Sequence, residues 1–142
     1  MDAVLETAPY TTECIECGSL MEATVVEVLT GGTHRWDLEG DCGLCGCRWN
    51  ECGYETPLAG MRAAILAANG PTTLQLVGGD VTPAAVMRAL RTVRSLTVAE
   101  ARDLAEVLGG RGLEGTRVEM EVLAVPLRAV GASLRIRSSD TM

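Results

Sequence analysis

The sequence predicts an α+β fold in two unlike modules, and three observations predict it. Residues 1–57 hold all six cysteines among extended, β-branched segments, whereas the later residues show apolar side chains at helical spacing between short extended segments. Charge divides in the same way: residues 1–57 carry 11 acidic side chains against two arginines, and residues 58–142 carry ten arginines against eight acidic side chains. We therefore expect an acidic cysteine module at 1–57, a linker helix at 58–72 and an α/β domain at 73–142.

Overall composition excludes several classes of protein. The chain has 142 residues, a formal net charge of −7 and 47% hydrophobic residues, which excludes general disorder. It contains no run of 18 apolar residues, and its acidic first 13 residues lack the apolar segment of a signal peptide. We expect a cytoplasmic protein whose cysteines are thiols or metal ligands. With a single histidine and no nucleophile–base pair in view, we do not expect an enzyme, and the lysine-free, arginine- and alanine-rich composition indicates a GC-rich bacterial genome.

The cysteine module contains two short Cys-x-x-Cys-Gly segments, called knuckles below. They are Cys14-Ile-Glu-Cys17-Gly and Cys42-Gly-Leu-Cys45-Gly. Two thiolates three residues apart can face one ion from a tight turn, and the glycine after each pair lets backbone amides approach the sulfurs. We therefore predict a structural Zn²⁺ site made of Cys14, Cys17, Cys42 and Cys45, closed to substrate because all four positions are filled.

The segment between the knuckles is predicted to be a β-hairpin. Residues 23–29 and 34–39 form its strands and Gly31-Gly32 its turn, which returns the second knuckle to the first. Residues 48–54 supply a third strand. From Cys14 to Thr56 this arrangement resembles a zinc ribbon.

Other polar and aromatic residues of this module leave alternatives open. Cys47 and Cys52 are either small buried residues with inert thiols or an alternative ligand or redox pair. His34 is expected to be a strand or surface residue. Trp36, Trp49 and Tyr54 either cover the hairpin and shield the zinc or anchor a partner.

The linker and the second module show clear helix boundaries. A helix over 58–68 stops at Asn69-Gly70-Pro71. Strands are expected at 73–77 and 133–137, and three helices between them. The first helix starts at Thr82-Pro83, and the other two start at Thr97 and Thr116, each with a glutamate three residues later as in a capping box.

The stretches AAVMRALRTVRSLTVAEARDLAEVL and LRAVGASLRIR carry a resemblance to a known family. From Thr73 to Arg137 the chain resembles the C-terminal domain of the bacterial ribosomal stalk protein (L-seven/L-twelve). The resemblance implies a β-α-α-β-α-β domain with a three-stranded sheet, which recruits translation GTPases through its first helix pair. By position it implies a factor-binding role for Val86, Met87, Arg88 and Arg91, and Arg102 matches a basic position of the family. The family's N-terminal dimerisation segment and hinge are replaced here by the cysteine module.

The residues themselves favour a protein partner. Arg88, Arg91 and Arg94 follow one another at intervals of three, with no acidic residue between Val81 and Ala99, so this helix offers a face to an acidic or apolar docking surface, unless it is only a solvated face. The zinc module, at −9, would repel nucleic acid. Alternative functions are an RNA- or ribosome-associated protein that binds through the second module, a thiol redox protein, and an adaptor like that of the Clp protease. Gly79-Asp80 resembles the acidic entry loop of that adaptor.

Overall fold

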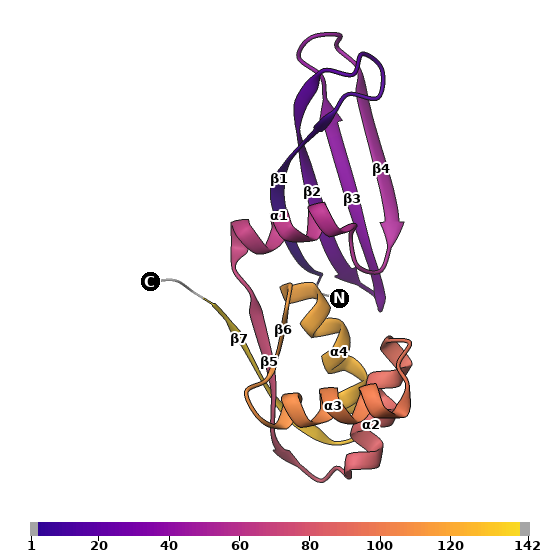
Figure 1. Ribbon diagram of the computed structural model, residues 1–142, viewed down its shortest axis with the longest axis vertical. Coiled ribbons are helices and arrows are strands. Elements are labelled where there is room, and N and C mark those ends of the chain that lie inside the picture. Colours follow the sequence, from indigo (N-terminus) through magenta and orange to yellow (C-terminus); the bar gives the residue numbers. More distant parts are fainter. Residues whose placement is uncertain (1–2, 140–142) are drawn as a thin grey trace. The chain divides into compact units, whose positions relative to one another are not determined.

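The computed structural model describes residues 3–139 and divides the chain into two compact units, Met1–Gly70 (unit 1) and Pro71–Met142 (unit 2) (Figure 1). Unit 1 holds the four-stranded sheet and one helix, and unit 2 holds a three-stranded sheet and three helices. This is the mixed α+β fold class that the sequence predicts. Among the described residues, no helix is long and apolar enough to cross a membrane.

The sheet of unit 1 is an antiparallel meander in the order β1-β2-β3-β4. Its strands are β1 (Val4–Glu13), β2 (Leu20–Thr30), β3 (Thr33–Asp41) and β4 (Arg48–Tyr54). The predicted hairpin is β2–β3, which turns at Gly31 and Gly32, both with positive φ, and β4 is the predicted third strand. Strand β1 is an addition that the sequence analysis did not identify, and it pairs with β2 along its whole length.

The predicted linker helix belongs to unit 1. Helix α1 (Ala59–Asn69) packs on one face of the sheet, where Met61 and Ile65 meet Ala8, Val25 and Leu38 in a buried cluster. At its end the Asn69 side chain donates a hydrogen bond of 3.0 Å to the Thr7 carbonyl of β1, and Gly70 ends the helix with a φ of 78°. The helix therefore covers the apolar face of a sheet that would otherwise be open to water.

Two tryptophans lie over two glycines across the β3–β4 pair. Trp36 is the register partner of Gly53, and Gly40 is the register partner of Trp49. A Cβ at Gly53 would lie 2.6 Å from the Trp36 indole, and one at Gly40 would lie 2.8 Å from the Trp49 indole. Each indole therefore occupies the space that a side chain would fill if the facing residue were not glycine. Aromatic side chains are known to cover glycines on neighbouring strands in this way.

Unit 2 has the β-α-α-β-α-β order. Its elements are β5 (Thr72–Gly79), α2 (Pro83–Val93), α3 (Val98–Gly109), β6 (Leu113–Gly115), α4 (Arg117–Ala129) and β7 (Ala132–Ser138). Its antiparallel sheet has the order β6-β5-β7. The three predicted N-termini are confirmed: the Thr82 hydroxyl accepts a hydrogen bond from the Ala85 amide, and Thr97–Glu100 and Thr116–Glu119 form complete capping boxes.

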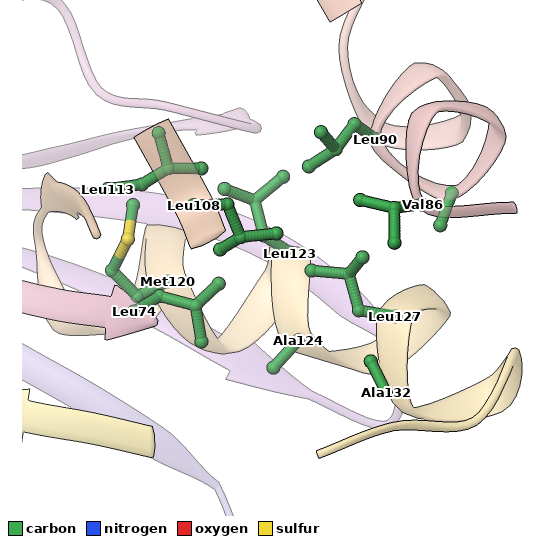
Figure 2. Close-up of a cluster of buried hydrophobic side chains, with 11 residues drawn as sticks. Leu74, Val86, Leu90, Leu108, Leu113, Met120, Leu123, Ala124, Leu127 and Ala132 are labelled. Carbon is green, nitrogen blue, oxygen red and sulfur yellow. The ribbon is translucent and has the colours of Figure 1, made fainter. Parts of the chain in front are cut away.

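The core of unit 2 is aliphatic and lies between the sheet and the helices. Leu74 from β5, Leu90 from α2, Leu108 from α3 and Leu123 from α4 are buried and converge on one another (Figure 2). This unit contains no aromatic residue. Close packing of leucine, valine, alanine and methionine therefore supplies its stability.

We predict that Gly53→Ala lowers the free energy of unfolding of unit 1 by about 1–3 kcal/mol, because the new methyl group displaces the Trp36 indole. Urea unfolding followed by tryptophan fluorescence measures it, since both tryptophans lie in unit 1. Gly43→Ala is the control, because a Cβ there meets no heavy atom within 4 Å. Equal midpoints for the two variants would contradict the prediction.

Candidate functional site

The two knuckles have the same backbone structure. In the first, the Gly18 amide donates to the Cys14 carbonyl (2.9 Å) and the Cys14 amide to the Ser19 carbonyl (2.8 Å). In the second, the Gly46 amide donates to the Cys42 carbonyl and the Cys42 amide to the Cys47 carbonyl, both at 2.9 Å. Gly18 and Gly46 each have a φ of 76°, a conformation that strongly favours glycine. The sequence signal Cys-x-x-Cys-Gly thus describes the turn itself.

Strand register brings the knuckles together. The first knuckle joins β1 to β2 and the second joins β3 to β4, next to the register pairs Glu13–Leu20 and Asp41–Arg48. In an antiparallel meander, alternate connections lie at the same end of the sheet, and β2–β3 pairing keeps these two side by side. Because β1 pairs with β2 on either side of it, the first knuckle is the loop of a β1–β2 hairpin.

The sulfur atoms of Cys14, Cys17, Cys42 and Cys45 form one cluster, in which all lie within 4.8 Å of one another. Cys14 Sγ is 3.6 Å from Cys45 Sγ, and Cys17 Sγ is 3.7 Å from Cys42 Sγ. A tetrahedral ion with metal–sulfur bonds of about 2.3 Å separates its sulfurs by about 3.8 Å. All four cysteines are free thiols, so the cluster can hold a metal ion at the residues that the sequence predicts.

Local hydrogen bonds give the thiols unequal acidities. Hydrogen bonding between Cys17 and the hydroxyl and backbone of Ser19 lowers the pKa of Cys17 to about 6, and hydrogen bonds from the Cys17 and Glu16 amides lower the pKa of Cys14. At Cys45 the backbone of Cys47 lowers the pKa, but local desolvation and hydrogen bonding to the other three thiols raise it to about 12. The cluster therefore retains protons at neutral pH that an incoming ion must displace.

An apolar layer covers the inner side of the cluster. Buried Cys14 and Cys42 pack with Met21, and the half-buried Cys47 and Trp49 pack against them. Trp49 thus lies where a shielding side chain is expected, whereas Trp36 belongs to the core under α1 and Tyr54 is exposed. The two outer cysteines of the cluster, Cys17 and Cys45, are exposed.

The remaining candidate ligands do not join the cluster. Burial is the main cause that raises the pKa of the Cys47 thiol, and the raised pKa keeps this sulfur protonated. Cys52 lies exposed in β4, five residues along the chain from Cys47, and at roughly 3.3 Å per residue the extended strand between them spans more than the about 7 Å that a disulfide can bridge between Cα atoms. His34 Nε2 lies 2.7 Å from Oε2 of the fully buried Glu27, away from the knuckles.

Unit 2 gathers three of the six predicted partner-binding residues in one groove. The groove has a volume of about 410 Å³, and its lining is mostly apolar: Leu76, Val81, Pro83, Val86, Met87 and Ala105, with Arg102 and Glu106. Three segments build it, namely the end of β5 with the loop after it, the first half of α2, and α3.

The other three predicted partner-binding residues, Arg88, Arg91 and Arg94, do not line this groove and have unlike surroundings. Arg88 is exposed. Arg91 Nε donates a hydrogen bond of 3.0 Å to the Leu96 carbonyl, which fixes the turn between α2 and α3. Arg94 is half-buried at the C-cap of α2. The fold thus uses part of this arginine series for its own structure.

We predict that Cys17→Ser lowers the affinity of the full chain for its metal ion by at least about tenfold, because one thiolate ligand is lost. Elemental analysis of purified protein and chelator competition measure it. Cys52→Ser, a change at an exposed cysteine outside the cluster, is the matched control and should retain the ion. Equal metal content and affinity in both variants would contradict the assignment of the ligands.

We predict that metal affinity falls as the pH falls from 8 to 5, because protons compete with the ion for the same sulfurs. At pH 7 the ion displaces protons from thiols with a raised pKa, such as Cys45. Below pH 6 the Cys17 thiolate also takes up a proton, so the fall becomes steeper there. Competition with a chromogenic chelator at each pH measures it, and an affinity independent of pH would refute it.

Comparisons with known proteins do not add to this description. No protein-family model, no curated protein and no solved structure matches the chain. The description of the four-cysteine cluster as a metal-binding site therefore rests on its own geometry and chemistry.

Proposed function

We propose that the cluster holds a structural zinc ion. Four thiolates at tetrahedral spacing are a donor set that suits Zn²⁺, and they leave no position for water or substrate. Such an ion contributes folding free energy, on the order of 10–16 kcal/mol apparent in small zinc domains. The main apolar core of unit 1 is small and lies under α1. An ion that joins the two knuckles therefore adds stability at the end of the sheet, where few apolar side chains pack.

We further propose that the protein is a non-enzymatic adaptor of the cytoplasm, where thiols stay reduced, and that unit 2 docks a protein partner. The groove lined by Val86, Met87 and Arg102 carries this proposal. It is apolar and concave and has a cationic side chain in its lining, which suits an apolar anchor next to an acidic group. Met87 adds a side chain that adapts to different apolar shapes.

The class of partner to test first is a translation GTPase, as the resemblance of residues 73–137 to the ribosomal stalk domain implies. The exposed Arg88 follows Met87 in α2 and adds positive charge beside the groove residues. Nucleic acid is disfavoured as a ligand of unit 1. A groove of about 590 Å³ in this unit has Glu22, Glu39 and Asp41 in its lining, and the arginine of that lining, Arg48, already pairs with Asp41 at 3.1 Å.

We predict that Met87→Glu and Arg102→Glu each weaken binding to a purified bacterial translation GTPase by at least about tenfold, because each changes the lining of the groove. Isothermal titration calorimetry with the full, metal-loaded chain measures it. Arg135→Glu on β7 is the charge-matched control, because the residues on either side of it in the strand, Leu134 and Ile136, pack against the core, whereas Arg135 is exposed.

If the unaltered chain binds the GTPase and both groove variants bind it equally well, the proposed docking site is wrong. No binding of the unaltered chain to the GTPase would remove this class of partner. Equal metal content in all variants shows that unit 1 is intact.

A further inference from the structure

The four sulfurs of the cluster form two pairs that cross between the knuckles. Cys14 of the first knuckle lies 3.6 Å from Cys45 of the second, and Cys17 of the first lies 3.7 Å from Cys42 of the second. Each pair joins one buried cysteine, Cys14 or Cys42, to one exposed cysteine, Cys45 or Cys17. A reagent from solvent therefore reaches the exposed sulfur of each pair first, and the buried sulfur lies next to it.

We propose that this cluster is also a modification site for hydrogen peroxide, at which oxidation joins the knuckles through Cys14–Cys45 and Cys17–Cys42 disulfides. The release of an ion in this reaction rests on the zinc site proposed above. The choice of disulfide partners rests only on the sulfur distances and the exposure of the cysteines.

The reaction at each pair is a two-electron oxidation. The exposed sulfur, once its thiol has given up its proton, attacks one oxygen of peroxide, so that an S–O bond forms and the O–O bond breaks, and the leaving hydroxide takes up a proton to become water. The buried sulfur then attacks the sulfenic sulfur, so that the S–S bond forms and the S–O bond breaks. The second hydroxide also leaves as water, and the two sulfurs have together lost the two electrons that peroxide gained.

The short sulfur distances favour this pairing, and its bonds connect loops that are already adjacent. The sulfurs need to approach by less than 2 Å to reach the length of a disulfide bond, about 2.05 Å. Each new bond links the β1–β2 loop to the β3–β4 loop, which is the same connection that an ion makes. Oxidised unit 1 is therefore expected to keep its sheet while the cluster loses the sulfurs that bind metal.

The spacing of arginines gives a direct test by peptide mapping. The chain has no lysine, so trypsin cleaves only after arginine: peptide 1–35 contains Cys14 and Cys17, peptide 36–48 contains Cys42, Cys45 and Cys47, and peptide 49–62 contains Cys52. The full, metal-loaded chain is treated with hydrogen peroxide, its free thiols are alkylated, and the digest is analysed without reduction. A chromogenic chelator records released metal in parallel.

We expect peptides 1–35 and 36–48 to appear linked, at the sum of their masses less four hydrogens plus the one alkyl group on Cys47, and peptide 49–62 to remain unlinked. Disulfides within each knuckle would leave all three peptides separate, and a Cys47–Cys52 disulfide would link peptide 36–48 to 49–62. Either result, or the absence of oxidation, would overturn the proposal.

Two variants identify the partners. In Cys45→Ser, Cys17–Cys42 should still form and Cys14 should be recovered alkylated, whereas a Cys14–Cys42 bond would refute the pairing. Cys47→Ser is the control within the same peptide and should give the same linked product as the unaltered chain. If the purified protein contains no metal, the zinc proposal fails, and the same digest of the metal-free chain still decides the pairing.

Discussion

The structure of unit 1 depends on the register of one antiparallel meander. Because β2 pairs with β3 from Ala23–Gly40 to Thr30–Thr33, the loops at the far ends of both strands lie next to each other. Those loops are the two knuckles, whose four sulfurs lie within 4.8 Å of one another. A shift of the β2–β3 register by one residue would turn the side chains of one strand to the opposite face and separate the apolar residues under α1. Metal site and core therefore depend on the same alignment.

The parts of this unit that sequence reasoning found are those with local signals. Cys-x-x-Cys-Gly describes a turn, Gly31-Gly32 describes a hairpin connection, and β-branched residues mark β2. Strand β1 lacked such a signal, because Pro9 and scattered polar residues interrupt it, and Pro9 is accommodated only because β1 is an edge strand. The pairing of Trp36 with Gly53 was equally hidden, since it joins residues on different strands whose register the sequence does not state.

Unit 2 shows the same division between local and distant information. Its helix starts were predictable because a threonine and a glutamate three residues apart satisfy backbone amides at each start. The groove was not, because its lining comes from Leu76, Met87 and Ala105 on three segments that only the packed fold brings together. The use of Arg91 as a donor to the Leu96 carbonyl also needed the fold, since the arginine series appeared from the sequence as one exposed face.

The near-identical backbone of the two knuckles explains why the sulfur pairs cross. In each knuckle the first cysteine is buried and the second is exposed, so when the two loops face each other, the first cysteine of one meets the second cysteine of the other. This arrangement suits a tetrahedral ion, and it also aligns two thiol pairs for oxidation. All six cysteines lie in unit 1, and the groove of unit 2 is lined without a cysteine. Metal and thiol chemistry therefore acts directly on one unit only, while the proposed docking residues depend on aliphatic packing and charge.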